Sequence, residues 1–194
     1  MTELHIAIVD DDPSVRDSLA IFLSGKTRTV SAHADGESFL ESVSQRAPDI
    51  AFIDLKMPGL SGLEVLRRLA GPPCPGVMIS AHGDISAAVQ ASKLGAMDFI
   101  EKPFAPEIVE EILADLQRPP QQAGADAACG AALSALTERE REIALALNEG
   151  LTNKEVARQL EISPRTVEVH RAHIFQKVGV RNLAGLVRVL SRVT

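Results

Sequence analysis

Acidic, basic and hydroxyl side chains stand at the ends of four predicted strands in the first half of the chain. The stretch IVDDD places Asp10 and Asp11 directly after one apolar run, and AFIDL places Asp54 at the end of another. Ser80 and Lys102 end two further runs in the same way. A buried carboxylate is unfavourable unless it is paired or used, so Asp54 in particular indicates a functional site.

These side-chain types together suit the handling of a phosphoryl group. A carboxylate is a possible nucleophile, a lysine offsets negative charge, and a hydroxyl donates to phosphoryl oxygens. Clustered carboxylates repel one another, and Mg²⁺, which prefers oxygen ligands, relieves that repulsion. Taken singly, each residue also fits an ordinary loop, surface or structural role. Asp12, which precedes Pro13, is interpreted as a helix cap.

Alternating strand-like and helix-like segments predict how these side chains come together. Several strands are continuous apolar runs, as in parallel strands that are covered on both faces. Five such repeats predict an α/β fold with a five-stranded, doubly wound parallel sheet. With the strand order 2-1-3-4-5, the acids after the first and third strands meet at one edge. The predicted strands are 5–9, 29–34, 50–55, 76–81 and 98–102, and the helices are 12–24, 36–46, 61–70, 84–94 and 105–117.

The second half of the chain is predicted to be a separate, all-helical domain. The stretch QRPPQQAGADAACGAA contains no large apolar side chain, so it is interpreted as a linker over residues 119–133. It divides residues 1–118 from a helical domain at 134–194. Thr137 and Thr152 each precede a glutamate by three positions, which is the pattern of a capping box. The predicted helices are 137–148, 152–160, 163–178 and 181–191, and the short second turn is typical of a helix-turn-helix.

Composition and charge narrow the class of protein. The net charge is −6, but residues 1–118 hold 18 acidic and 10 basic side chains, whereas residues 134–194 hold 7 and 10. This asymmetry favours two domains with different partners. The two cysteines lack metal-ligand spacing and fit a reducing cytoplasm. Neither a basic leader nor an 18-residue apolar run is present, so no membrane association is expected.

The first 118 residues resemble the receiver domain of bacterial two-component response regulators, which has a flavodoxin-like fold. The motifs that carry the resemblance are IVDDDPSVRDSL, DLKMPGLSGLEVL and MISAHGDISAAVQASKLGAMDFIEKPF. The resemblance implies that Asp54 is the phosphoacceptor. It also implies that Mg²⁺ binds directly to Asp11, Asp54 and the backbone carbonyl of Lys56, with Asp10 acting mainly through water.

The same resemblance implies a switch. Ser80 and Lys102 would contact the phosphoryl oxygens, and Ser80 would move toward them together with an inward swing of Phe99. Ser80 stands where threonine is frequent in the family, and Phe99 where tyrosine is frequent. The Lys102–Pro103 bond is expected to be cis, as in many relatives. The fourth helix, fifth strand and fifth helix would form the responding surface, which is also the predicted dimer face.

The C-terminal segment contains the stretch LTEREREIALALNEGLTNKEVARQLEISPRTVEVHRAHIFQKVGVRNLAGLVRVL. This stretch resembles the LuxR/FixJ-type helix-turn-helix domain over nearly its full length. Helical spacing places Val167, Ile174 and Val178 on one packing face of the third helix. The resemblance implies that this helix enters the major groove of DNA. Its opposite face and the adjacent helix supply the predicted DNA-binding residues: Glu168, Val169 and Ala172 toward bases, Lys154, Arg165, Thr166, Arg171 and Lys177 toward phosphates, and His170 on the same face.

The combined resemblance implies a phosphorylation-activated transcriptional regulator of the FixJ type. A sensor histidine kinase would phosphorylate Asp54, the receiver would form a homodimer, and the helical domains would bind promoter DNA and, with RNA polymerase, raise transcription. One alternative is a regulator that ignores phosphorylation and uses the receiver only as a dimerisation scaffold.

An enzymatic function is not expected. A phosphatase of the haloacid-dehalogenase kind needs a second aspartate two positions after the nucleophile, where this chain has Lys56. A flavin-binding relative would need a phosphate-binding loop after the first strand, but Asp10, Asp11 and Asp12 would repel that phosphate.

Overall fold

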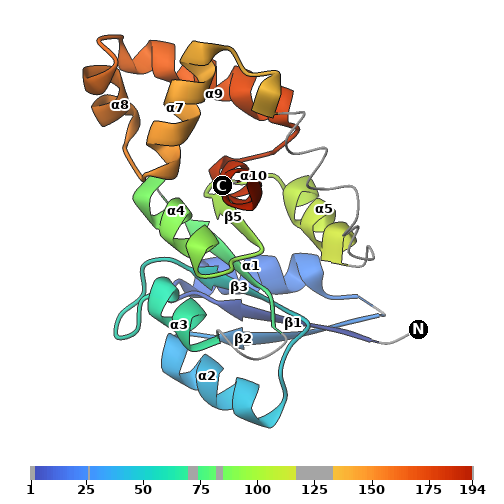
Figure 1. The fold of residues 1–194 in the computed structure, drawn as a ribbon. Helices are drawn as coiled ribbons and strands as arrows, with labels where there is room; N and C mark the ends of the chain where they lie inside the picture. The colour runs from blue at the N-terminus through green and yellow to red at the C-terminus, as the bar shows by residue number, and fades with distance from the viewer. Residues whose placement is uncertain (1–2, 26, 70–73, 82–84, 117–132, 194) are drawn as a thin grey trace. The chain divides into compact units, whose positions relative to one another are not determined.

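The computed structural model describes residues 3–25, 27–69, 74–81, 85–116 and 133–193 (Figure 1). Contacts divide the chain into two compact units, residues 1–83 with 94–109, and residues 84–93 with 110–194. Residues 117–132 of the expected linker and the expected cap Asp84 lie outside the described residues, so the boundaries at 118 and 134 stay predictions. Within the described part of the chain, no helix has the length and apolar character needed to cross a bilayer.

The first unit is built on a five-stranded parallel sheet with the order β2-β1-β3-β4-β5, which confirms the predicted fold class. Its strands are β1 (Leu4–Val9), β2 (Arg28–His33), β3 (Ile50–Asp54), β4 (Gly76–Ser80) and β5 (Asp98–Glu101). The predicted bounds agree with these to within one residue. Val9 pairs with Ile53 and Asp54 with Ile79, so the carboxyl ends of neighbouring strands lie level with one another.

Three helices of this unit flank the sheet on both faces. They are α1 (Pro13–Leu23), α2 (Gly36–Gln45) and α3 (Gly62–Leu69). Figure 1 shows α1 over one face of β1 and β2, and α2 with α3 on the other. Asp12 caps α1 by accepting from the backbone N–H of Ser14 at 2.8 Å, and Asp35 caps α2 in the same way. The helix α5 (Pro106–Leu116) belongs in part to each unit.

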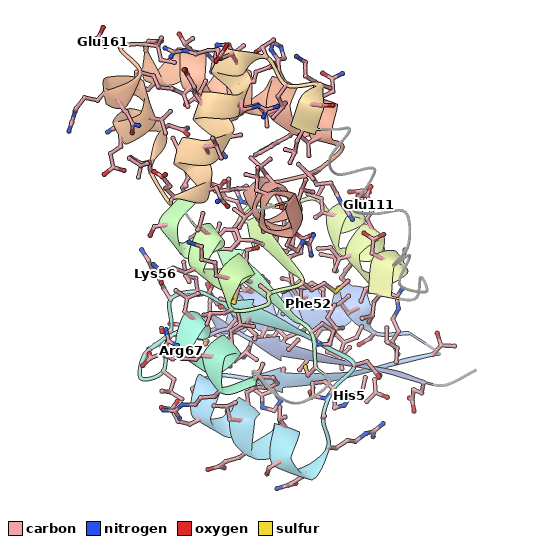
Figure 2. All side chains as sticks on the ribbon, viewed as in Figure 1. His5, Phe52, Lys56, Arg67, Glu111 and Glu161 are labelled. Atoms are coloured by element: carbon pink, nitrogen blue, oxygen red, sulfur yellow. The ribbon has the colours of Figure 1, made fainter. Side chains whose placement is uncertain are left out.

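The core of the sheet is apolar, and it approaches the backbone of α3 closely. Every residue of β3 and β4 is buried, and Phe52 lies wholly inside (Figure 2). Gly62, the first residue of α3, leaves no room for a side chain. A Cβ atom there would stand 2.2 Å from the carbonyl oxygen of Asp54. The start of α3 is therefore packed directly against the end of β3.

The second unit contains α4 (Ile85–Lys93) and four helices from the C-terminal part of the chain. These are α7 (Glu138–Asn148), α8 (Asn153–Gln159), α9 (Pro164–Val178) and α10 (Leu183–Val193). The predicted capping boxes are present: Thr137 exchanges hydrogen bonds with Glu140, and Thr152 with Glu155. These reciprocal bonds satisfy backbone N–H groups that a helix start leaves free.

A residue with positive φ follows each of the two helices of the helix-turn-helix, Glu161 after α8 and Gly179 after α9. Gly179 follows α9 with a φ of 72°, as glycine at this position commonly does. Glu161, between α8 and α9, has a φ of 55°, which is unfavourable for a residue with a Cβ atom. Its side chain projects from this turn (Figure 2). Of the predicted packing face of α9, Val167 and Ile174 are fully buried and Val178 is half-buried; Ile143 of α7 is also fully buried.

Candidate functional site

A pocket of about 370 Å³ opens at the carboxyl ends of the strands. The predicted acid-site residues all line it, apart from Phe99. Its walls are Asp10, Asp11, Asp12, Val15, Asp54, Leu55, Lys56, Ser80, Ala81 and Lys102. Apart from Val15 of α1, these residues lie at or just after the ends of β1, β3, β4 and β5, as expected for the open edge of a parallel sheet.

Asp54 is the last residue of a fully buried strand, and its side chain faces the pocket. The residue is only 6% exposed. Its Oδ1 accepts a hydrogen bond from Lys102 Nζ at 2.7 Å, and its Oδ2 accepts one from the backbone N–H of Lys56 at 2.7 Å. Burial raises the pKa of this carboxyl above its usual value, despite the opposing effect of Lys102 and the Lys56 N–H. Both carboxylate oxygens are therefore held in place.

Asp10 is the second buried carboxylate, with 1% of the residue exposed. Its Oδ2 accepts from Lys102 Nζ at 2.6 Å, and its Oδ1 accepts from the backbone N–H of Asp12 at 3.0 Å. Its backbone carbonyl accepts from Nη1 of Arg16 at 2.7 Å. Sequence reasoning missed Arg16, although its place one turn into α1 puts it within reach of the preceding loop. Arg16 ties this loop to the helix.

Lys102 joins the two carboxylates. One ammonium donates to Asp10 and to Asp54, which come from neighbouring strands. Desolvation acts against its charge, but the hydrogen bonds to Asp10 and Asp54 outweigh it and raise the pKa of the ammonium. This shared cation offsets the repulsion that two adjacent carboxylates experience. The Lys102–Pro103 bond that follows is cis, as expected.

The other predicted residues of the acid site differ in exposure. Asp11 is exposed at the wall of the pocket, whereas Ser80 is 2% exposed and reaches the pocket from the end of β4. Phe99 lies in β5 opposite Met78 and is buried, outside the pocket lining. Its role as a switch residue stays a prediction.

The donor set fits a hard divalent cation in chemical type. Carboxylate oxygens and the backbone carbonyl of a lining residue are the ligands that Mg²⁺ prefers. Across the described residues, no group of three acidic, histidine or cysteine side chains already stands at metal-ligand spacing. The carboxylates of Asp10 and Asp54 instead share Lys102. The negative charge of these two carboxylates is therefore offset by a cation of the chain itself.

In the helical domain, α8 and α9 form the predicted helix-turn-helix. On the outer face of α9, Glu168, Val169 and Ala172 are exposed, as a helix that reads base edges requires. Val169 is 45% exposed, which is unusual for a large apolar side chain in this chain. Thr166 and His170 are half-buried, and the Thr166 hydroxyl pairs with that of Ser163.

Three of the four predicted basic phosphate contacts have partners inside the domain. Arg165 pairs with Glu168 at 3.1 Å, and Lys177 pairs with Glu140 at 2.7 Å. Arg171 donates from Nη1 to the side-chain oxygen of Asn153 at 3.0 Å. Lys154 is exposed at the start of α8. The sequence indicated these basic residues but not their partners. The partners of Lys177 and Arg171 lie on other helices, and the pair of Arg165 with Glu168 depends on the side-chain rotamers within α9.

Glu140 is the most strongly perturbed acid of this domain. It is 4% exposed and accepts hydrogen bonds from Lys177 and from the backbone and hydroxyl of Thr137. The bond from Lys177, followed by those from Thr137, lowers the pKa of Glu140 to about 2. One side chain thus caps α7 and anchors the last turns of α9.

Comparisons with known proteins match both halves of the chain. The family model for the response regulator receiver domain matches residues 6–114, and that for the luxR family of bacterial regulatory proteins matches residues 134–190. The chain is 40% identical to the transcriptional regulatory protein FixJ of Rhizobium meliloti, over 97% of this chain and 96% of the relative. It is 38% identical to the response regulator protein TmoT of Ectopseudomonas mendocina, over 98% and 90%.

Two solved structures of response regulators also resemble this chain over nearly its full length. Full-length FixJ from B. japonicum matches with a TM-score of 0.54 and 36% identity, covering 100% of this chain and 98% of that one. The response regulator StyR matches with a TM-score of 0.55 and 34% identity, covering 98% and 100%.

Proposed function

This chain belongs to the FixJ-like two-component response regulators, which carry a receiver domain and a LuxR-type DNA-binding domain, and from this membership we propose a specific route of regulation. A sensor histidine kinase phosphorylates Asp54, the receiver forms a homodimer, and the helical domains bind promoter DNA. Transcription then rises through RNA polymerase, in the cytoplasm. The observation that carries the proposal is the position of Asp54, a buried carboxylate held at the open end of β3.

The phosphotransfer step uses the residues of the pocket. An oxygen of Asp54 forms a bond to phosphorus while the bond from phosphorus to the kinase's histidine nitrogen breaks, giving an acyl phosphate and a free imidazole. For this, Lys102 leaves the Asp54 oxygen and donates to a phosphoryl oxygen instead. Ser80, which lines the pocket from the end of β4, would donate a second hydrogen bond. Asp11, Asp54 and the backbone carbonyl of Lys56 would hold Mg²⁺, with Asp10 acting mainly through water, and the ion would supply positive charge for the phosphoryl oxygens.

A groove beside the pocket supports the approach of a kinase. It has a volume of about 470 Å³ and shares Val15 and Lys102 with the acid pocket. Its remaining walls come mainly from α1 and from the segment after β5, including Phe22 and Phe104. An apolar surface next to a reacting carboxylate suits a protein donor that must bring its histidine close to Asp54.

The helical domain supports DNA binding through α9. Glu168, Val169 and Ala172 are exposed on the face that we assign to the bases. Glu168 can accept a hydrogen bond from cytosine N4, and Val169 can contact a thymine methyl group. Phosphate contacts fix the position of the helix without reading sequence, and we assign them first to Lys154 and to Arg165 and Thr166 at the start of α9.

The proposal is tested by labelling full-length protein with acetyl phosphate and Mg²⁺ and then measuring DNA binding. Wild type, Asp54→Asn and the control Asp17→Asn, an exposed aspartate on α1, are compared. We expect labelling and tighter DNA binding in wild type and in Asp17→Asn, and neither in Asp54→Asn. If Asp54→Asn loses labelling but all three proteins bind DNA equally tightly, the receiver acts only as a dimerisation scaffold, which is the alternative function.

A further inference from the structure

Arg171 was expected to contact a DNA phosphate, but its guanidinium group is engaged inside the helical domain. Nη1 donates to the side-chain oxygen of Asn153 at 3.0 Å, and the guanidinium carbon lies 5.6 Å from the centre of the Phe175 ring. Both Arg171 and Asn153 are half-buried. The hydrogen bond runs from the middle of α9 to the first residue of α8.

The partner of Arg171 is a well-fixed residue. Asn153 directly follows Thr152, whose hydroxyl and backbone N–H are both bonded to Glu155 in a capping box. The first turn of α8 is therefore rigid, and a bond to it constrains where α9 can lie. The planar guanidinium donates to Asn153 while it lies over the ring of Phe175, a fixed fork geometry that the compact ammonium of a lysine does not reproduce.

We propose that Arg171 is a positioning residue: it clamps α9 to the start of α8 through Asn153, and it supports DNA binding through this clamp rather than through a phosphate. The phosphate contact in this region is assigned instead to Lys154, which neighbours Asn153 and is exposed. The inference rests on the DNA-binding role of this domain. It also explains why an arginine stands among residues that face DNA while its charge is turned toward α8.

Salt dependence separates a phosphate contact from a clamp. Each phosphate neutralised adds ~0.9 to the slope of log K against log salt for duplex DNA. The probe is a 24-base-pair duplex that labelled wild type selects from a random-sequence pool. Full-length variants are compared with it at several salt concentrations: Arg171→Met, Arg171→Lys, Asn153→Ala, the double variant Arg171→Met with Asn153→Ala, and Lys154→Met as a phosphate-contact reference.

The clamp predicts that Arg171→Met weakens binding roughly tenfold and leaves the salt slope unchanged, whereas Lys154→Met lowers the slope by ~0.9 for each DNA-bound protomer, or ~1.8 for the homodimer. Arg171→Lys keeps the charge but loses the clamp, so it is expected to bind as weakly as Arg171→Met. The double variant binds no more weakly than Arg171→Met, because the two partners act as a unit.

The proposal is overturned if Arg171→Met lowers the slope as Lys154→Met does, if Arg171→Lys binds like wild type, or if the two single losses multiply. Thermal unfolding of the same variants gives a readout without DNA. The melting temperature of the double variant should equal that of the less stable single variant. A double variant whose loss in melting temperature is the sum of the two single losses would contradict the clamp. Failure of wild type to select any duplex would instead count against DNA binding itself.

Discussion

The ammonium of Lys102 lies 2.7 Å from Oδ1 of Asp54 and donates a hydrogen bond to it. The same ammonium donates to Asp10 at 2.6 Å, so one cation from the end of β5 holds the two buried carboxylates of the pocket. This arrangement explains how the chain tolerates two acidic groups on neighbouring strands. It also keeps Oδ1 of Asp54, the proposed nucleophilic carboxylate, in a hydrogen bond.

Removal of this cation should destabilise the receiver. Lys102→Ala leaves Asp10 and Asp54 facing each other without a charge partner, and breaking a buried ion pair is expected to lower the free energy of unfolding by about 3 kcal/mol. Mg²⁺ should restore part of this loss. The measurement is urea denaturation with and without Mg²⁺, with Lys56→Ala as control, because only the backbone N–H of that residue contacts Asp54. A variant as stable as wild type without metal would contradict the pairing.

A side chain at Gly62 should disturb the end of β3. The Cβ atom of Gly62→Ala would stand 2.2 Å from the carbonyl oxygen of Asp54, so the backbone must move. We expect the free energy of unfolding to fall by about 3 kcal/mol, together with slower labelling of Asp54. Gly25→Ala is the matched control, since a Cβ there meets no atom within 4 Å. Equal denaturation midpoints for the two alanine variants would rule out this close approach.

Acid should weaken the helical domain through Glu140. The hydrogen bond from Lys177, with those from Thr137, lowers the folded-state pKa from 4.5 to about 2. Because the pKa of Glu140 is lower in the folded state than in the unfolded state, its carboxylate stabilises the fold at a pH above the unfolded-state pKa of 4.5. This stabilisation is lost as the pH falls from 4.5 toward 2. Hydrogen exchange of the α7 and α9 amides between about pH 5 and pH 3 measures this loss.

The matching variant is Glu140→Gln, which should already exchange faster at pH 5 and show a flatter pH dependence than wild type. Glu142→Gln serves as control, because the carboxylate of Glu142 is about half exposed in its pair with Arg139 and such pairs contribute little. Parallel pH profiles for wild type and Glu140→Gln would show that this carboxylate does not link acid to stability.

The turn between α8 and α9 offers a stabilising substitution. Glu161 has a φ of 55°, where a Cβ atom is disfavoured and asparagine is better tolerated than most residues. Glu161→Asn should therefore raise the free energy of unfolding by about 0.5–1 kcal/mol. Glu161→Val should lower it, because a β-branched residue fits this region worst. Calorimetry of the three proteins checks the order, and a valine variant as stable as wild type would refute the strain.

Much of the fold followed from local patterns in the sequence. Continuous apolar runs located β3 and β4, and the threonine–glutamate spacings located the starts of α7 and α8. These signals act over a few residues, so they are visible without the fold. The cap at Asp12 was predicted for the same reason.

The partners of the charged residues were harder to predict. Arg16 bonds to the carbonyl of Asp10, and Lys177 bonds to Glu140 across 37 positions of sequence. The first of these contacts spans only six residues, whereas the second depends on how α7 and α9 pack, and no local pattern indicates it. The sequence therefore indicated which side chains matter at the acid pocket and on α9, whereas the structure supplied what each side chain touches.

The order of Asp10, Asp54 and Lys102 along the chain also has a consequence for synthesis on the ribosome. Asp10 and Asp54 belong to early strands, and Lys102 follows Asp54 by 48 residues, after β5. At translation rates of about 5–20 residues per second, the nascent chain carries Asp54 without its lysine for about 2–10 s, and Asp10 for longer. Addition of β5 at the edge of the sheet then completes the backbone pairing and brings in the missing cation in one event. Charge compensation at the pocket thus waits until the last strand of the sheet has been made.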